Sequence, residues 1–156
     1  MYLEILLIII AVIIVGYLFF YYADILLAPN TLQSLENQVC FGLQCFSVQL
    51  AETSAERERG LMYVKQLGKN NGMLFVFGKE DIYPFWMKNT LIPLDMIWMD
   101  SNYKVVYTAQ NVQPCKTFIC PTINPGAKAK YALEVNAGIS EKNGIKVGSI
   151  ASFLIK

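Results

Sequence analysis

The segment from Phe85 to Asp95 holds the densest group of side chains that could recognise a ligand. On an extended strand Trp86 and Lys88 share one face, and Asn89 follows directly. A tryptophan ring offers a stacking surface, a lysine a positive charge, and an asparagine both donors and acceptors of hydrogen bonds. This group could bind a sugar or an anion. The alternative is a core strand that leads into a turn, with Asn89 and Thr90 bonded to local backbone.

Asp95 and Glu134 are acidic residues that interrupt apolar strand patterns. If both carboxyl groups converge on one cleft, their pKa values could separate into acid and base roles. Arg59 could pair with either carboxylate or stabilise developing charge. The alternative is that both acids face solvent, and two carboxylates of unknown separation do not define a catalytic site. The candidate ligand-binding residues are Trp86, Lys88, Asn89, Asp95, Glu134 and Arg59, and the candidates for catalysis are Asp95 and Glu134.

The composition excludes several classes of site. The chain of 156 residues contains no histidine, which removes Ser-His and Cys-His nucleophilic sites, histidine bases and nearly every catalytic zinc site. The formal net charge is only +1 and no basic block occurs, so nucleic acid is not an expected partner. Phosphate loops, dinucleotide fingerprints and calcium loops are absent from the sequence. We therefore expect no cofactor and no metal ion.

The four cysteines form two pairs of equal spacing, Cys40 with Cys45 and Cys115 with Cys120. Paired cysteines in a small domain favour disulfides and an oxidising compartment, with local pairing the simplest connectivity. A structural zinc site with four thiolates and inert buried thiols are the alternatives. The disulfide interpretation places the domain outside the cytoplasm.

The N-terminal part of the chain is strongly apolar, and Ile5 to Tyr22 contains no charged side chain. A helix over this run would span about 27 Å, close to the ~30 Å hydrocarbon core of a bilayer. We therefore predict a transmembrane anchor over residues 1–22, with the lipid bilayer as partner through 5–22. A tether over 23–39 and a folded domain over 40–156 follow. The predicted location is a single pass through the cytoplasmic membrane, and a cleaved signal peptide is the alternative.

The elements that must position the candidate residues are mainly short strands. Alternation predicts a strand over 45–51, and Thr53 with Glu56 has the spacing of a capping box that opens a helix. Further strands are predicted over 73–77, 85–88, 94–99, 104–110, 130–135 and 149–155, with a helical turn over 140–143. The expected fold is α+β, mostly antiparallel β. It would form a small barrel-like or strongly curved sheet with one or two short helices, preceded by one transmembrane helix.

Several ordered motifs resemble one family. They are Arg59-Gly60-Leu61-Met62, Gly72 to Phe77, Phe85 to Thr90 with Pro93-Leu94-Asp95, Pro114-Cys115 with Cys120-Pro121, Tyr131 to Val135 with Ala137-Gly138, and Gly148. In these segments the chain is similar to the uncharacterised DUF192 family, from about residue 46 to 153. The resemblance implies a compact, mainly β domain, often behind a signal or an anchor in bacteria and archaea. It supplies no reaction, and it implies that Cys115 and Cys120 match a cysteine pair seen in many members.

Three functions are compatible with these features. The first is a membrane-anchored extracytoplasmic domain of unknown biochemical activity that binds a small polar or sugar-like ligand or acts as an accessory domain. The second is a carboxylate-dependent hydrolase or lyase that uses Asp95 and Glu134. The third is an envelope protein-interaction module that uses the long loop over 111–127. The sequence lacks an activated nucleophile, so it favours binding over catalysis, and it leaves the oligomeric state open.

Overall fold

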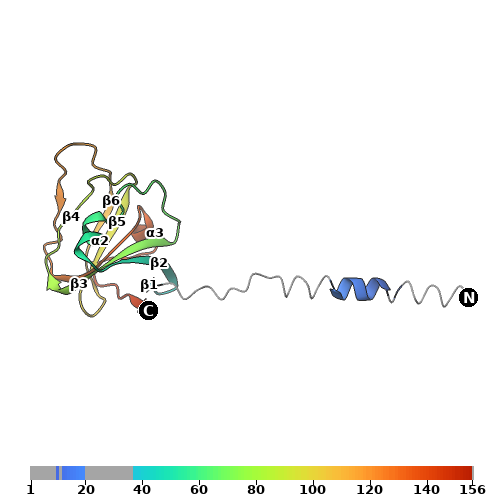
Figure 1. Ribbon diagram of the computed structural model, residues 1–156. Helices are drawn as coiled ribbons and strands as arrows, with labels where there is room; N and C mark the ends of the chain where they lie inside the picture. The colour runs from blue at the N-terminus through green and yellow to red at the C-terminus, as the bar shows by residue number, and fades with distance from the viewer. Residues whose placement is uncertain (1–9, 11, 20–36, 156) are drawn as a thin grey trace, which may run out of the picture. The chain divides into compact units, whose positions relative to one another are not determined.

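The computed structural model describes residues 10, 12–19 and 37–155, and the chain divides into two compact units, residues 1–35 and 36–156. In the first unit, residues 12–19 are helical (Figure 1). No helix in the described part of the chain is long and apolar enough to cross a membrane. This finding contradicts the predicted transmembrane helix; residues 5–9, 11 and 20–22 of that span lie outside the described residues.

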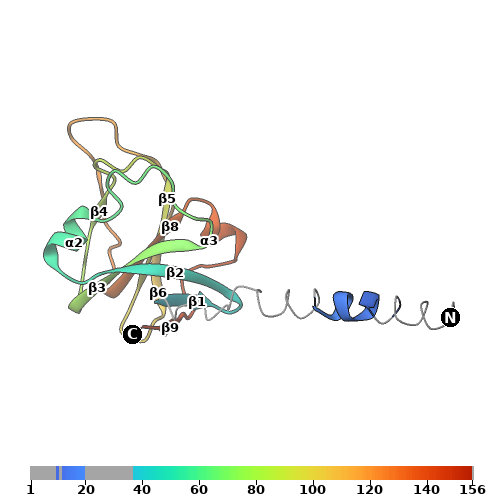
Figure 2. The same ribbon diagram turned by 45° about the vertical axis from the view of Figure 1, so that its right-hand side comes forward.

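A seven-stranded sheet forms the framework of the second unit, in the order β6-β5-β8-β3-β2-β1-β9 (Figure 2). Its strands are β1 (Gln38–Phe41), β2 (Gln44–Ala51), β3 (Asn71–Asp81), β5 (Leu94–Met99), β6 (Val105–Val112), β8 (Ala129–Asn136) and β9 (Ser152–Leu154). All neighbours are antiparallel except β2 and β3, which run parallel. The short strands β4 (Phe85–Trp86) and β7 (Thr122–Ile123) pair separately. The first strand therefore begins inside the segment predicted as a tether, whose residues 23–36 lie outside the described residues.

The sheet is open, and the expectation of an α+β barrel-like fold is wrong. Across residues 37–155, the edge strands β6 and β9 do not pair with each other. The start of β6 does approach the segment that precedes β9. Lys104 and Ile150 form an isolated bridge, Val105 N donates to Ser149 O at 2.8 Å, and Ala151 N donates to Tyr103 O at 2.9 Å. The short β9 instead forms its ladder with β1, so these bonds do not continue into a closed barrel. The domain is a mostly-β fold with two short helices between residues 37 and 155.

The first of these helices, α2 (Ser54–Arg59), begins with the predicted capping box, which is confirmed. Glu56 N donates to Thr53 Oγ1 at 3.2 Å, and Thr53 N donates to Glu56 Oε2 at 2.8 Å. The hydrogen bonds from the Thr53 backbone lower the pKa of Glu56. The helix ends at Gly60, which has a φ of +46°. The cap therefore fixes where α2 starts, and the glycine fixes where the chain turns toward the sheet.

The sheet buries apolar side chains on both faces. Alternation along each strand sends neighbours such as Leu74 and Phe75 to opposite faces. One face carries a cluster that includes Val39, Phe46, Val48, Leu74, Ile97, Met99, Leu133 and Val135, against which Ile139 of α3 (Ile139–Lys142) packs. The other face carries a second cluster that includes Phe75, Phe77, Met87, Leu94, Met96, Trp98 and Ala132. Every residue of β5 is buried, so a polar side chain on the central strands must find a partner inside the protein or remain unpaired.

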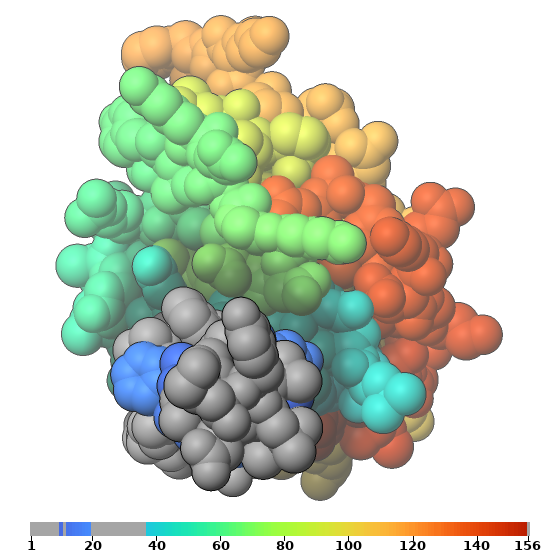
Figure 3. Space-filling model, turned by 90° about the vertical axis from the view of Figure 1, so that its right-hand side faces the viewer, coloured from blue at the N-terminus to red at the C-terminus, as the bar shows by residue number. Residues whose placement is uncertain are grey.

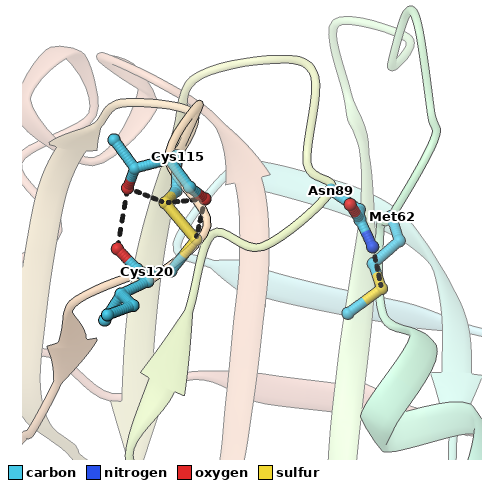
Figure 4. Close-up of a disulfide and its surroundings, with 6 residues drawn as sticks. Met62, Asn89, Cys115 and Cys120 are labelled. Atoms are coloured by element: carbon cyan, nitrogen blue, oxygen red, sulfur yellow. Dashed lines mark hydrogen bonds between the residues drawn. A yellow bond between two sulfur atoms is a disulfide. The ribbon is translucent and has the colours of Figure 1, made fainter.

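Both disulfides form, and each joins the local pair that the spacing favoured. Cys40 is bonded to Cys45 and Cys115 to Cys120 (Figure 4). The first bond closes the turn between β1 and β2, and the second closes a loop ahead of β7. Among the residues that the structure describes, no cluster of His, Cys, Asp and Glu could hold a metal ion. The disulfide interpretation is therefore confirmed over the zinc and free-thiol alternatives.

Candidate functional site

A pocket of about 270 Å³ lies on the second face of the sheet, between α2 and β4. We call it the Glu134 pocket after the carboxyl group in its lining. Its lining residues are Arg57, Glu58, Arg59, Gly60, Leu61, Met62, Phe75, Phe77, Tyr83, Pro84, Phe85, Trp86, Lys88, Thr90 and Glu134. A second hollow adjoins it, sharing Trp86 and Lys88 and adding Ala55 and Asn89. The lining is mainly aromatic and apolar, with charged side chains at the entrance.

Glu134 is the buried polar group of this pocket. It lies in the middle of β8, opposite Met73 of β3 and Met96 of β5, and only 5% of its surface is exposed. Its Oε2 atom is buried and has no hydrogen-bond partner in the described part of the protein. Burial raises the pKa of the Glu134 carboxyl to about 8, because a low-dielectric environment disfavours the charged form. At neutral pH the group is therefore mostly protonated and can donate a hydrogen bond.

The aromatic walls of the pocket hold one another in place. Phe75 and Phe85 meet edge to face with ring centroids 4.7 Å apart, and Phe77 stacks on Tyr83 at 3.6 Å. Below them, Trp98 Nε1 donates to the backbone oxygen of Tyr83 at 3.0 Å, which fixes the segment that leads into β4. Aromatic pairs of this kind contribute about 0.5–1.5 kcal/mol beyond their burial. The pocket is thus largely formed before any ligand enters.

The entrance carries two cations without a carboxylate partner. The side chains of Arg59 and Lys88 are exposed and form no ion pair or hydrogen bond within residues 37–155. Lys88 Nζ lies 5.3 Å from the centre of the Trp86 ring. Arg57 differs, because its guanidinium donates to Val76 O at 3.0 Å and to Glu52 O, and it lies 5.4 Å from the centre of the Phe77 ring. Arg57 therefore braces the wall, while Arg59 and Lys88 remain available to an anion.

Backbone contacts hold the two sides of the pocket together. Met62 and Thr90 form an isolated β-bridge, and Tyr63 N donates to Asn89 O at 2.9 Å. Asn89 Nδ2 also donates to Met62 Sδ at 3.9 Å (Figure 4). Asn89 adopts a φ of +57°, a left-handed conformation that asparagine tolerates better than most residues. The loop after α2 is in this way tied to the turn after β4, so Asn89 positions the wall.

Asp95 lies on the opposite face of the sheet and has a different role. Its Oδ1 accepts hydrogen bonds from Asn111 N at 2.8 Å and Gly138 N at 3.1 Å. Its Oδ2 accepts from Ser140 N at 2.8 Å and from Ser140 Oγ at 2.5 Å. The fully buried carboxylate thus joins the end of β6 to the start of α3. A carboxylate with both oxygens occupied by structural donors is a clamp and does not contribute to the pocket.

The structure therefore separates the six residues that the sequence suggested. Arg59, Trp86, Lys88 and Glu134 line the Glu134 pocket, Asn89 lines the adjoining hollow, and Asp95 is absent from both. Sequence reasoning missed the aromatic walls, formed by Phe75, Phe77, Tyr83 and Phe85. Alternation along residues 73–77 does place Phe75 and Phe77 on one face. Only the register of β3 against β8 shows that this is the face of Glu134.

The fold and the site define a small, mostly-β, disulfide-bonded domain with a buried carboxyl group beneath an aromatic pocket. The chain belongs to the DUF192 family, described as an uncharacterized ACR, whose sequence profile matches residues 37–153. This match confirms the family resemblance and extends it to include β1. The family has no assigned reaction, so a function must be argued from the site.

One curated relative and two solved structures are similar to this chain. A UPF0127 protein of Thermococcus kodakarensis is 32% identical over 111 residues, which cover 68% of this chain and 64% of that protein, so the chain spans less than two thirds of this relative. A crystal structure from Sinorhizobium meliloti, described as a candidate transcription regulator, has a TM-score of 0.67 and 30% identity, covering 75% of this chain and 91% of that one. A protein of unknown function from Novosphingobium aromaticivorans has a TM-score of 0.67 and 34% identity, covering 74% of this chain and 82% of that one.

Proposed function

We propose that this domain binds a small ligand in the Glu134 pocket. The observation that carries the proposal is Glu134 Oε2, a buried atom without a hydrogen-bond partner in the described part of the chain, in the lining of a preformed hollow. Leaving a buried polar atom unpaired costs about 1–3 kcal/mol. A ligand that hydrogen-bonds to this atom offsets that cost, whereas a purely structural glutamate would have been given a partner by the fold, as Asp95 has been.

The size and shape of the pocket support a small occupant. Its volume of about 270 Å³ lies at the lower end of the range for small-molecule sites. The walls are apolar and the polar groups are few, which is the usual composition of such sites. The hydrolase or lyase alternative gains no support from the geometry, because Asp95 is fully bonded on the opposite face and Glu134 lacks a second buried carboxylate beside it among the described residues.

A ligand screen on the full-length protein tests this proposal. Ligand-observed NMR with a library of small aromatic, aliphatic and sugar compounds should reveal binders whose affinity falls at least tenfold in Trp86→Ala. Phe118→Ala is the matched control, because both rings are exposed but Phe118 lies outside the pocket. Binding that Trp86→Ala and Phe118→Ala affect equally, or a screen without any binder to the folded protein, would overturn the proposal.

We also propose that the domain works in an oxidising compartment. Two disulfides within a domain of this size support that placement. Alkylation of thiols in acid-quenched cells, followed by mass spectrometry of the unfolded protein, should find no labelled cysteine before reduction and four after it. Four labelled cysteines before reduction would place the domain in a reducing compartment instead.

A protein-interaction role is a second candidate, and one observation favours it. The loop closed by Cys115 and Cys120 projects from the domain, at the top of Figure 3 in orange, and its tip exposes Phe118 fully and Ile119 by 82%. Exposed apolar tips on braced loops are typical of contact sites. Replacement of both tip residues by Asp should abolish a crosslink to a partner protein in the native envelope fraction. A crosslinking pattern that this replacement leaves unchanged would remove the candidate.

A further inference from the structure

We propose that the ligand of the Glu134 pocket is a small aromatic carboxylic acid that carries a carbonyl group at the end opposite to its carboxylate. This proposal rests on the proposed function, because it names the ligand class of the same pocket. The ring would lie between the aromatic walls, the carboxylate at the entrance near Arg59 and Lys88, and the carbonyl oxygen at Glu134. Each part of the ligand follows from a different part of the site.

The walls favour a flat, apolar ring. Phe75 and Phe85 present an edge and a face to each other at 4.7 Å, and Phe77 is already stacked on Tyr83 at 3.6 Å. Aromatic rings prefer this mixture of edge and face contacts, and a ligand ring can join the set without a polar partner. The narrow volume of about 270 Å³ favours one ring over a longer chain or a fused system.

A sugar would fit the walls less well. Its several hydroxyl groups each need a hydrogen-bond partner once buried. The buried polar side chains of the described pocket lining are only those of Thr90 and Glu134. The sugar-like ligand that the Trp86, Lys88 and Asn89 cluster suggested would therefore leave hydroxyls unpaired, and the geometry selects against it.

The entrance favours a carboxylate. Arg59 and Lys88 both line the pocket, and neither side chain has an ion-pair partner in the chain from residue 37 to 155. Glu58 also lines the pocket and would repel an anion. Arg57, Arg59 and Lys88 outnumber it, so the net charge of these four side chains is positive. A charge-assisted hydrogen bond from guanidinium or ammonium to carboxylate is about twice as strong as a neutral one.

The inner end of the pocket, where Glu134 lies, favours a ligand group that accepts a hydrogen bond. A protonated Glu134 holds one O–H donor, and its Oε2 is buried without a partner in the described structure. A carbonyl oxygen of the ligand accepts from that O–H and carries no donor of its own that would need a partner. A second carboxylate on the ligand at this position would be a buried charge, which is costly. The other titratable side chains that line the pocket are Arg57, Glu58 and Arg59 from α2, Tyr83 before β4 and Lys88 after it.

The experiment measures the affinity of the full-length protein for para-acetylbenzoate by isothermal titration and ligand-observed NMR. Two analogues each lack one group: para-isopropenylbenzoate has no carbonyl oxygen, and acetophenone has no carboxylate. We expect each analogue to bind about tenfold more weakly, as the loss of one good hydrogen bond or charge contact predicts. Lys88→Gln should weaken para-acetylbenzoate severalfold and leave acetophenone unchanged, while Lys142→Gln on α3 is the matched control and should affect neither.

The pH dependence separates a donor at Glu134 from a general apolar preference. Because ionisation removes the proton that Glu134 donates, affinity for para-acetylbenzoate should fall more than tenfold between about pH 6 and about pH 9.5. Glu134→Gln keeps an N–H donor, so it should retain the preference for the carbonyl and lose this pH dependence. Glu134→Leu should remove the preference for the carbonyl, with far-UV circular dichroism confirming that both variants fold.

The outcomes distinguish this proposal from the function on which it rests. If glucose or an aliphatic compound binds in a manner sensitive to Trp86→Ala while all three aromatic probes fail, the ligand class is wrong and the binding function stands. If para-acetylbenzoate and para-isopropenylbenzoate bind equally, Glu134 does not recognise a carbonyl and this inference is overturned. If no compound binds in a manner sensitive to Trp86→Ala, both proposals fall.

Discussion

Asp95 and Glu134 lie on adjacent strands at the centre of the sheet, and their carboxyl groups point to opposite faces. In the β5–β8 ladder Asp95 pairs with Val135 and Met96 pairs with Glu134, so alternation sends the two acids to opposite faces. One carboxyl accepts four hydrogen bonds, and the other has a buried oxygen without a partner among the described residues. Two acids that look alike in the sequence are thus a structural clamp and a candidate ligand contact.

The buried carboxyl of Glu134 should make stability depend on pH. Its pKa is raised from 4.5 to about 8 in the folded protein, so the folded state holds one more proton than the unfolded state between these values. The stabilisation is complete below the unfolded pKa and is lost as pH rises toward the folded pKa, by about 1.4 kcal/mol for each pH unit. Glu134→Gln should flatten this dependence and become the more stable protein at alkaline pH. Urea unfolding across this pH window measures the difference.

Glu58→Gln is the matched control for this effect, because Glu58 lines the same pocket but is exposed. It should leave the slope of stability against pH unchanged. Identical slopes for wild type and Glu134→Gln would contradict the burial of an unpaired carboxyl at this position.

Asp95→Asn should destabilise the domain without acting through the pocket. The amide replaces one accepting oxygen with a donor, so buried donors from Gly138, Asn111 or Ser140 lose their acceptor. We expect a loss of about 3 kcal/mol or more in the free energy of unfolding, and about 1 kcal/mol for Ser140→Ala, which removes a single bond. Denaturant unfolding checks both values. An Asp95→Asn protein as stable as wild type would show that the clamp is unimportant.

The disulfides should stabilise the domain by similar amounts. Both join residues five positions apart, and closing a loop of that length in the unfolded chain corresponds to about 2 kcal/mol. The double variants Cys40→Ser/Cys45→Ser and Cys115→Ser/Cys120→Ser should each lose that much, as thermal and urea unfolding can measure. If both double variants fold and are as stable as the wild-type protein, the disulfides have no structural role.

Gly60 should be required for both the turn after α2 and the shape of the pocket. Its φ is +46°, and an added Cβ would lie 3.2 Å from Phe75 Cζ, inside the pocket wall. Gly42→Ala is the matched control, since Gly42 has a φ of +59° but an added Cβ there would meet no heavy atom within 4 Å. We expect about 1–3 kcal/mol of backbone strain from the positive φ in both variants. Gly60→Ala alone should also weaken ligand binding, and equal ligand affinity in the two variants would count against the proposed pocket wall.

Local signals predicted much of the secondary structure. The strand at residues 94–99 and the capping box at Thr53 both depend on neighbouring residues, and the structure contains both of them. Longer-range features were less accessible. The parallel pairing of β2 with β3 and the open edge between β6 and β9 depend on contacts between distant segments. The apolar N-terminal run matches a bilayer in length, but the described residues contain no helix that is long and apolar enough to cross a membrane.

The candidate site was predicted only in part, because local signals are visible in the sequence and long-range contacts are not. Trp86 and Lys88 stand out because they lie close together in one short segment, and both line the pocket. The sequence could not distinguish Asp95 from Glu134, because both are single acids in apolar strands. The distinction arises from the strand register and from the donors of Asn111 and Ser140, which lie 16 and 45 residues from Asp95. Register is set by the whole sheet and is not visible in a short motif.

The proton on Glu134 offers the sharpest test of whether this buried carboxyl is a ligand contact. The carboxyl carbon of Glu134, assigned with the Glu134→Gln variant, can be titrated by NMR in the full-length protein with and without a saturating pocket ligand. We expect a midpoint near 8 in the free protein, and a further upward shift when the ligand accepts the Glu134 proton. A midpoint near the ordinary value of 4.5, unchanged by a ligand that binds, would contradict this role for Glu134.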